Sequence, residues 1–317
     1  MNILVAGGSG FVGINLINQL CLNKSFNIKA TYNKSKPIKK FKNVLYIKCD
    51  LTNYRECLKI LKKIDVVFMF ASTLSTVSLM KKEPLGAIRN NTTININMLE
   101  SSYKLGIKKY IWLSSTTGYP DSSFTLDEKD FFLNEPPDSY LPVGYMHRYI
   151  EKLCKLYFEA SNKKMSITVL RPSAIYGMYD DFNLKTCHIL PAFIRQFAEK
   201  YKFIEIYGNG NQKRDWVFID DLVESCLLSL KKLKGYNVFN IASGKLTSSN
   251  EIIKMLKLIS KNKTTKIVYK KTNNIIVKKR SFSTVQVFKK IGFKSKTSIY
   301  DGLEKTYIWY YNHLKRN

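Results

Sequence analysis

A glycine-rich segment near the start of the chain combines the residue types and the spacing of a phosphate-binding loop. Gly7, Gly10 and Gly13 follow an apolar segment directly and open a helix-length segment. Glycine here allows a tight turn, a close approach of the backbone to a pyrophosphate, and close helix–strand packing. The helix start adds unpaired N–H groups and the positive end of the helix dipole. We therefore predict a dinucleotide-binding loop rather than a glycine-rich turn without a ligand. Its contacts are assigned to Gly7, Ser9, Gly10, Phe11, Val12 and Gly13.

The end of the second expected strand bears on which dinucleotide is bound. An NAD site uses a carboxylate there to accept hydrogen bonds from the ribose hydroxyls. Here the segment holds Asn33, Lys34 and Lys36 and no acid, and lysines suit the 2′-phosphate of NADP. We expect NADP to be favoured over NAD, the alternative being that these lysines are solvated loop charges. Cofactor contacts at the second and third strand ends are assigned to Asn33, Lys34, Asp50 and Leu51, the last two beside the adenine.

The first half of the chain alternates strand-like and helix-like segments, which must position these residues. Short β-branched runs predict strands over residues 2–6, 27–32, 44–48, 65–70, 109–113 and 166–170. Apolar periodicity predicts helices over residues 11–22, 54–61, 84–105 and about 145–161. This alternation is typical of an α/β fold, a Rossmann-type doubly wound parallel sheet.

The pattern loosens after residue 171, which suggests a second, smaller region. We expect a dinucleotide-binding domain over residues 1–170, to which residues 219–242 return, and a smaller C-terminal α/β region over residues 171–317.

Composition narrows the classes of protein that this chain could be. The 52 Lys and Arg outnumber the 24 Asp and Glu, for a net charge of +28, which favours anionic partners. The lysines are spread along the chain, and no nucleic-acid-binding motif is present, so we expect no nucleic acid partner. No apolar run reaches the roughly 20 residues of a membrane helix, and no signal peptide is recognisable. We therefore expect a cytoplasmic protein that does not associate with a membrane.

Cysteine and histidine usage argues against a metal site. The 6 cysteines form no closely spaced pair and are expected to be buried, reduced thiols. Only 3 histidines are present, so we expect no metal ion.

Several segments, in this order, carry a resemblance to a known family. They are residues 7–13, 50–51, 65–68, 113–115, 171–177, 214–222, 291–293 and 302–309. Their order resembles the extended short-chain dehydrogenases/reductases of the NAD(P)-dependent epimerase/dehydratase family, which act on nucleotide sugars. The resemblance implies a nucleotide-diphosphate sugar as the substrate, held by the C-terminal region.

Two of these stretches resemble the GDP-fucose synthases, which are 3,5-epimerases and 4-reductases, more than other members. They are residues 113–120, a serine-containing loop, and residues 187–195, where those enzymes carry an acid/base histidine. The resemblance implies that Ser115 bonds the sugar 4-oxygen and that His188 moves the proton in epimerisation; a strand-end serine and a structural histidine are the plain alternatives. The sugar dehydratases carry Asp-Glu where this chain has Thr116 and Thr117. Threonine does no acid/base work near neutral pH, so dehydration is disfavoured.

The redox dyad of the family, Tyr-x-x-x-Lys, is altered here. Registered on the segment 148–151, the Tyr position holds Val143 and the Lys position holds His147. Tyr145 is a candidate substitute, but on a helix it lies about 200° around the axis from Val143. His147 is assigned to the nicotinamide ribose or, alternatively, to the helix surface. The candidate catalytic side chains are therefore Ser115, His188, Tyr145 and His147.

The resemblance also places other contacts. Further cofactor contacts are assigned to Phe70, Ala71, Ser72, His147, Pro172 and Ile175. Substrate contacts are assigned to Thr73, Ser115, Thr116, Thr117, Arg214 and Arg280, with both arginines on the diphosphate.

The function implied is that of an NAD(P)-dependent nucleotide-sugar epimerase or reductase acting on a (4-keto) hexose nucleotide, in the synthesis of surface polysaccharide or glycan precursors. Epimerisation is favoured because the tyrosine is missing. The alternative is a non-catalytic NAD(P)-binding regulator or scaffold of the same fold. The resemblance further implies a homodimer, formed by the helices expected at residues 84–105 and 145–161.

Overall fold

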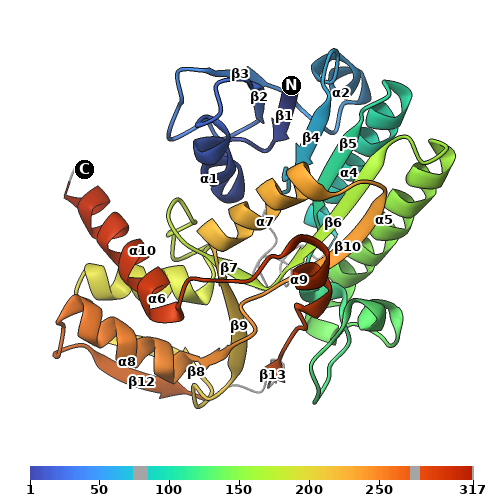
Figure 1. Ribbon diagram of the computed structural model, residues 1–317. Helices are drawn as coiled ribbons and strands as arrows, with labels where there is room; N and C mark the ends of the chain where they lie inside the picture. The colour runs from blue at the N-terminus through green and yellow to red at the C-terminus, as the bar shows by residue number, and fades with distance from the viewer. Residues whose placement is uncertain (74–84, 272–278, 316–317) are drawn as a thin grey trace.

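The structure, a computed structural model, describes residues 1–73, 85–271 and 279–315. Strands and helices alternate through the first half of the chain, as the apolar patterns predict (Figure 1). The strands are β1 (Asn2–Ala6), β2 (Asn27–Tyr32), β3 (Val44–Lys48), β4 (Val66–Met69), β5 (Lys109–Leu113) and β6 (Ser166–Pro172). The helices between them are α1 (Phe11–Leu20), α2 (Tyr54–Ile60), α4 (Gly86–Lys104) and α5 (Leu141–Ala160).

These strands form one parallel sheet of 7 strands in the order β10-β6-β5-β4-β1-β2-β3. The last member, β10 (Tyr236–Ile241), is reached through α7 (Ile219–Lys232) and pairs in parallel with β6. The predicted doubly wound parallel sheet is confirmed. Strand order reverses between β1 and β4, and ligands of such sheets bind at the carboxyl ends of the strands beside this reversal.

Alternation along each strand separates two apolar layers. On one face Ile3 and Val5 pack with α1 and α7; on the other, Leu4 and Ala6 pack with α2, α4 and α5. Successive strand residues point to opposite faces, so a strand covered on both sides must be apolar throughout. Each flanking helix therefore needs one apolar stripe, as the sequence periodicity indicates.

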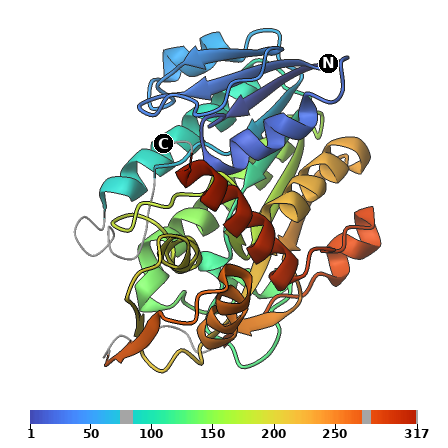
Figure 2. The same cartoon turned by 90° about the vertical axis from the view of Figure 1, so that its left-hand side faces the viewer.

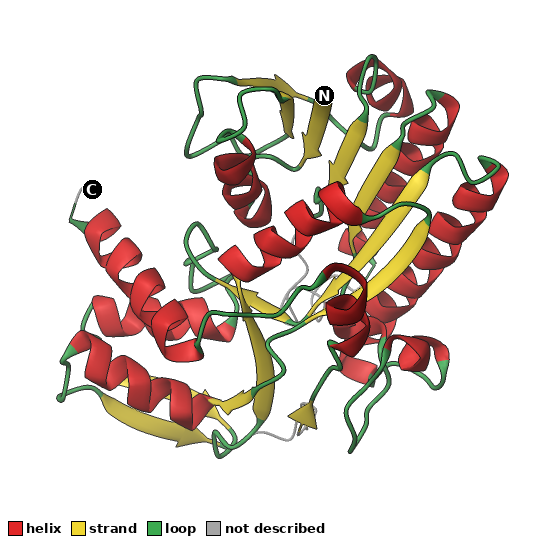
Figure 3. Cartoon of the chain, in the orientation of Figure 1, coloured by secondary structure: helices red, strands yellow, loops and turns green. Residues whose placement is uncertain are grey.

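The rest of the chain forms a smaller region below the main sheet (Figures 1 and 2). One small sheet contains β7 (Ala174–Tyr176), β9 (Lys213–Phe218), β11 (Leu246–Ser248) and β13 (Lys279–Arg280); β8 (Phe203–Tyr207) pairs with β12 (Lys266–Lys270). The helices are α6 (Ile189–Ala198), α8 (Ser249–Ser260), α9 (Val285–Ile291) and α10 (Ile299–Leu314). Of these, α6, α8 and α10 pack together. Figure 3 shows the small sheets apart from the seven-stranded one. The division at residue 170 stays a prediction.

The predicted start of α5 at residue 145 is wrong, because the helix begins at Leu141. Pro142 lies in the first turn, where a missing N–H costs no hydrogen bond. Gly144 is required by close packing, since a Cβ there would lie 2.9 Å from the carbonyl oxygen of Thr117. Val143 and His147 consequently lie on the same helix, one turn apart. Other boundaries move by one or two residues, and Pro84, the predicted first residue of α4, lies outside the described residues.

Across the described ranges, none of the helices combines the length and apolar character that a membrane span requires.

Candidate functional site

The glycine loop has the backbone of a dinucleotide-binding turn. Gly7 has a φ of +83°, in the region that favours glycine, and a Cβ there would lie 2.7 Å from the backbone nitrogen of Ala71. A Cβ on Gly13 would collide with the carbonyl oxygen of Gly7. At Gly10 the nearest atom to an added Cβ is that same oxygen, at 3.4 Å. Gly7 and Gly13 are thus needed for packing, whereas Gly10 leaves its outer side open to a ligand.

The N-terminus of α1 lies next to the open outer side of Gly10. Gly10 is the N-cap residue, and because glycine has no side chain it makes no capping hydrogen bond. Among the described residues, the N–H groups of Phe11, Val12 and Gly13 have no hydrogen-bond partner. Unpaired N–H groups and the positive end of the helix dipole bind phosphate. This open cradle fits the pyrophosphate of NAD(P).

Apart from His147 on α5 and Ile175 on β7 of a small sheet, the other residues assigned to the cofactor lie at or just beyond strand ends of the main sheet. Asn33 and Lys34 follow β2 and are exposed. Asp50 and Leu51 lie beyond β3, which ends at Lys48, and the Asp50 carboxylate accepts hydrogen bonds from Thr52. The remaining positions follow β4 and lie at β6 and β7: Phe70, Ala71, Ser72, Pro172 and Ile175.

The serine-containing loop, residues 113–120, begins at the last residue of β5. The Ser115 Oγ accepts hydrogen bonds from the backbone N–H and the hydroxyl of Thr117, both at 3.1 Å. Its own proton remains available to a ligand oxygen. Thr116 is buried, and its carbonyl oxygen accepts a hydrogen bond from Arg280. Thr73, after β4, exchanges two hydrogen bonds with the buried side chain of Asn91 on α4.

Helix α5 carries the altered dyad. Val143 is 8% exposed and packs in the core, whereas Tyr145 is 44% exposed. This difference agrees with the expected 200° between them, so a phenol at residue 145 does not take the place of one at residue 143. His147 is half-buried beside Trp112, and loss of hydration lowers the pKa of His147 to about 4. The ring is therefore neutral at pH 7 and offers no positive charge.

His188 is the N-cap residue of α6, at the start of a helix as predicted, and it is exposed. Partial loss of hydration lowers the pKa of His188 below 6.5, while the nearby Asp181 opposes this shift. Within the described part of the chain, His188 makes no hydrogen bond with Ser115 or His147. The lowered pKa of His188 favours the neutral imidazole, which can accept a proton.

Arg214 and Arg280 lie side by side. They are directly opposed on the parallel strands β9 and β13. The Arg280 guanidinium donates to the carbonyl oxygens of Thr116 and Tyr119, at 2.8 and 3.1 Å. Its Nε is buried without a partner among the described residues. Arg280 therefore joins the arginine pair to the serine-containing loop.

Two neighbours of this pair were not predicted from the sequence. Tyr140, at the start of α5, lies with its ring 5.2 Å from the Arg280 guanidinium. Burial lowers the pKa of Arg214, and Tyr140 and Asp121 oppose this shift by their charge, Tyr140 also by a side-chain hydrogen bond. Burial likewise lowers the pKa of Arg280, which Arg214 lowers further. Two close, largely desolvated guanidinium groups suit an anion with two phosphates.

A buried ion pair lies behind the serine-containing loop and was also missed. Arg171, at the end of β6, contacts both carboxylate oxygens of Glu151 on α5, the shortest distance being 2.6 Å. Arg171 also donates to the Tyr119 hydroxyl at 2.9 Å. Both members of the pair are almost fully buried. The only sequence signal was the placing of Glu151 four residues after His147, one helical turn along α5.

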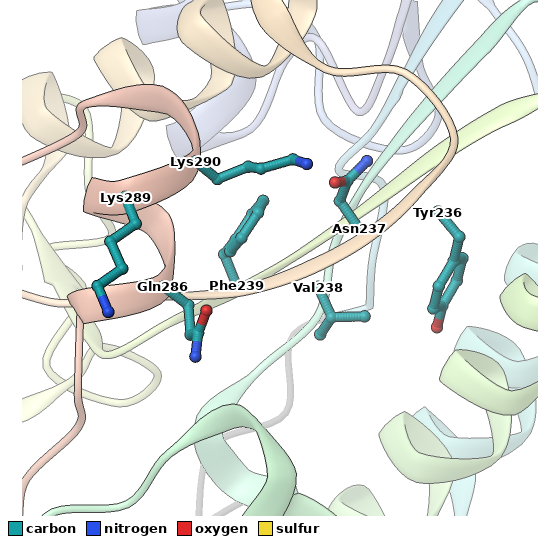
Figure 4. Close-up of a pocket in the computed structure, with 7 residues that line it drawn as sticks. All are labelled: Tyr236, Asn237, Val238, Phe239, Gln286, Lys289 and Lys290. Carbon is teal, nitrogen blue, oxygen red and sulfur yellow. The ribbon is translucent and has the colours of Figure 1, made fainter.

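A hollow of about 320 Å³ is lined by none of these residues, and the close-up in Figure 4 shows the side chains that line it. It is formed at the sheet edge by β10 and α9, and it is lined by Tyr236, Asn237, Val238, Phe239, Gln286, Lys289 and Lys290. Since it includes none of the assigned residues, we do not count it as part of the candidate site.

The fold and the glycine loop define a Rossmann-type dinucleotide-binding protein. The model of the NAD dependent epimerase/dehydratase family matches residues 3–242, and the chain belongs to this family. The family predicted from the motifs is therefore confirmed, and with it an NAD(P)-dependent enzyme.

Relatives of this chain are nucleotide-sugar enzymes by name. It is 26% identical to GDP-mannose 3,5-epimerase 1 of Oryza sativa subsp. indica, over 100% of this chain and 83% of the relative. It is 24% identical to GDP-L-fucose synthase 1 of Arabidopsis thaliana, over 78% of this chain and 77% of that one. Among solved structures, UDP-glucose 4-epimerase of Thermotoga maritima with UDP-glucose is 26% identical with a TM-score of 0.89, over 99% and 100% of the two chains.

Proposed function

We propose that this protein is an NAD(P)-dependent nucleotide-sugar epimerase that moves a proton on a carbon next to the C4 ketone of a hexose nucleotide. The observation that carries the proposal is the in-register pair Arg214 and Arg280, of which Arg280 donates to the Thr116 carbonyl oxygen in the serine-containing loop. A diphosphate on this pair places the attached sugar within reach of that loop. The similarity to a GDP-mannose 3,5-epimerase and a UDP-glucose 4-epimerase supports the same class of substrate.

In this proposal the two arginines bind the diphosphate, and Ser115 donates its free proton to the sugar 4-oxygen. His188 takes a proton from the carbon beside the ketone, and the hydrogen bond from Ser115 stabilises the enolate oxygen. Inversion follows when a proton, supplied by water, adds to the opposite face of the same carbon, while His188 releases to solvent the proton that it took up. The glycine loop would hold the pyrophosphate of NAD(P) and His147 its nicotinamide ribose, and the bound cofactor would supply hydride exchange at C4.

Epimerisation is favoured over reduction because of α5. Reduction of a ketone requires a proton donor at the new alkoxide, and Val143 is apolar. His147 is neutral at pH 7 because its pKa lies near 4, so it neither donates readily nor lowers the pKa of a phenol. Removal of a proton beside an existing ketone requires neither group.

Proton exchange tests this function. Incubation with a 4-keto nucleotide sugar in deuterated water should incorporate deuterium beside the carbonyl, which mass spectrometry and proton NMR detect. His188→Asn should abolish incorporation. His313→Asn is a matched control, since His313 is exposed on α10 and stacks on Trp309. Cofactor binding without any deuterium uptake or epimer would instead support the regulator or scaffold alternative.

The proposal includes a homodimer. Helices α4 and α5 pack side by side, and α5 exposes Tyr149 and Leu156, 53% and 63% accessible. Two copies of this helix pair would cover these apolar side chains in a four-helix bundle. Light scattering should give twice the monomer mass of 36.7 kDa at micromolar concentration.

A cytoplasmic location also belongs to the proposal. All six cysteines are free, four of them buried as expected, while Cys21 and Cys187 are half-buried; free thiols fit a reducing compartment.

A further inference from the structure

The imidazole of His147 lies beside a serine whose hydroxyl proton is already committed. Ser114 is the first residue after β5 and is only 4% exposed. Its hydroxyl donates to the Glu151 Oε1 at 2.6 Å. The same Ser114 Oγ lies 3.5 Å from Nδ1 of His147. The direction of the first hydrogen bond therefore decides what the second can be.

Glu151 can only accept this hydrogen bond. Its carboxylate is paired with the Arg171 guanidinium, which donates to Oε1 at 3.0 Å and to Oε2 at 2.6 Å. An ionised carboxylate has no proton to give. A serine hydroxyl has one proton and two lone pairs, so once the proton points to Glu151, Ser114 offers only lone pairs to a further neighbour.

We propose that Ser114 is a positioning residue that holds His147 as the Nδ1–H tautomer, so that Nε2 presents a hydrogen-bond acceptor to a ligand hydroxyl. An unprotonated Nδ1 would place two lone pairs against each other in a buried setting. Among the described residues, Nε2 of His147 has no hydrogen-bond partner. The Trp112 ring, with its centroid 5.7 Å from that of His147, limits rotation of the imidazole.

The consequence is an inversion of hydrogen-bond polarity. A lysine at this helix position can only donate, whereas the Nδ1–H tautomer of His147 accepts through Nε2. The ligand group must then be a donor, and a ribose hydroxyl of the bound dinucleotide meets this requirement. That ligand role rests on the proposed function; the tautomer is a property of the protein alone and is independent of it.

Nitrogen NMR of the ¹⁵N-histidine-labelled protein at pH 7 tests the tautomer. The two ring nitrogens have distinct shifts when one is protonated, and His147 is assigned from a His147→Gln sample. We expect the Nδ1–H form to exceed the other by roughly five- to tenfold, the ratio that a net hydrogen bond of about 1 to 1.4 kcal/mol produces. A dominant Nε2–H form, or an imidazolium, would overturn the proposal.

Two variants separate positioning from a general structural effect. Ser114→Ala should shift the tautomer ratio towards equality or beyond, while Glu151 keeps its contacts with Arg171. Ser114→Thr retains the hydroxyl and should keep the native ratio. An unchanged ratio in Ser114→Ala would contradict the proposal, whether or not the protein is an epimerase.

Calorimetry with NADP⁺ then tests the ligand role. We expect Ser114→Ala to bind several-fold more weakly than the parent, and Ser114→Thr to bind like it. Unchanged binding with a shifted tautomer would overturn the ribose contact alone and leave the tautomer established.

Discussion

Arg280 on β13 lies directly opposite Arg214 on β9 in a parallel pairing. Residues paired in this way point to the same face of the sheet. Arg280 is held by the carbonyl oxygens of Thr116 and Tyr119, so its charge is anchored beside the serine-containing loop. Like charges in such proximity cost free energy in the absence of an anion, and burial adds to that cost. The pair is therefore an arrangement that a bound diphosphate would stabilise.

The first prediction concerns this pair. Arg214→Ala should weaken the binding of a nucleoside diphosphate sugar roughly 10- to 150-fold, because a charge-assisted hydrogen bond contributes about 1.5–3 kcal/mol. Calorimetry measures the affinity, and the melting temperature shows whether the fold is retained. Arg55→Ala, at an exposed position on α2, is the matched control and should change neither. Equal affinities for Arg214→Ala and the control would exclude the arginine pair as the diphosphate site.

The second prediction separates binding from folding in the glycine loop. Gly10→Val should abolish binding of either dinucleotide, because the side chain would occupy the place of the pyrophosphate. An added Cβ has no neighbour closer than 3.4 Å there, so the melting temperature without ligand should stay near that of the parent. Gly13→Ala should lower it, since the new methyl would collide with the Gly7 carbonyl. A Gly10→Val protein that still binds NADP⁺ would refute the loop assignment.

The third prediction concerns the choice of cofactor. The protein should bind NADP(H) at least as well as NAD(H), and Lys34→Ala should weaken NADP(H) binding alone. Lys34 is exposed, so we expect only about a two- to fivefold loss, which salt should reduce further. Titrations with both dinucleotides at low and high ionic strength measure this. A clear preference of the parent for NAD would refute the role of the lysines.

Local chemistry predicted most of the elements and the strand–glycine–helix backbone well, whereas the binding role of the glycine loop stays a prediction. The strand–glycine–helix unit at residues 2–20 was predictable because each of its determinants is a neighbour in sequence. The start of α5 was not, because Gly144 is needed for packing against Pro136 and Thr117, which lie outside the helix. A turn or helix boundary set by tertiary contact leaves no local signal.

The pairing of Arg214 with Arg280 and the buried ion pair could not be predicted from the sequence. Arg280 belongs to a two-residue strand, too short for any pattern, and its register with Arg214 exists only in the folded sheet. The Glu151–Arg171 pair joins a helix to a strand that follows it. A charged residue in a helix is ordinarily solvated, so the burial of Glu151 could not be read from its neighbours.

The fourth prediction follows from the shifted pKa of His147. An unfolded histidine titrates near 6.5, whereas burial lowers the pKa of His147 to about 4 in the folded protein. Between these values the unfolded state binds more protons, so the free energy of unfolding falls as pH decreases from 6.5 to 4. The loss from this group is at most about 3.5 kcal/mol, at about 1.4 kcal/mol per pKa unit.

Urea midpoints at pH 7 and pH 4.5 for the parent and His147→Gln check this prediction. Other groups titrate in both proteins, so the informative quantity is the difference between the two. The variant should lose less stability than the parent on acidification. Identical losses would show that His147 titrates normally.

The last prediction concerns the altered dyad. Hydride transfer to a ketone leaves an alkoxide, and with Val143 in the tyrosine position its protonation falls to Ser115 or to water. Positioned acid–base catalysis contributes roughly 10²–10⁴-fold, so NADPH oxidation with a 4-keto nucleotide sugar should be slow while deuterium exchange through His188 proceeds. The double variant Val143→Tyr with His147→Lys should raise the rate of NADPH oxidation by up to this factor, because the lysine charge lowers the pKa of the new phenol. Val143→Tyr alone should gain far less, since the neutral His147 supplies no charge, and Tyr145→Phe should leave the parent rate unchanged. Rapid NADPH oxidation by the parent that Tyr145→Phe removes would show instead that Tyr145 is the proton donor.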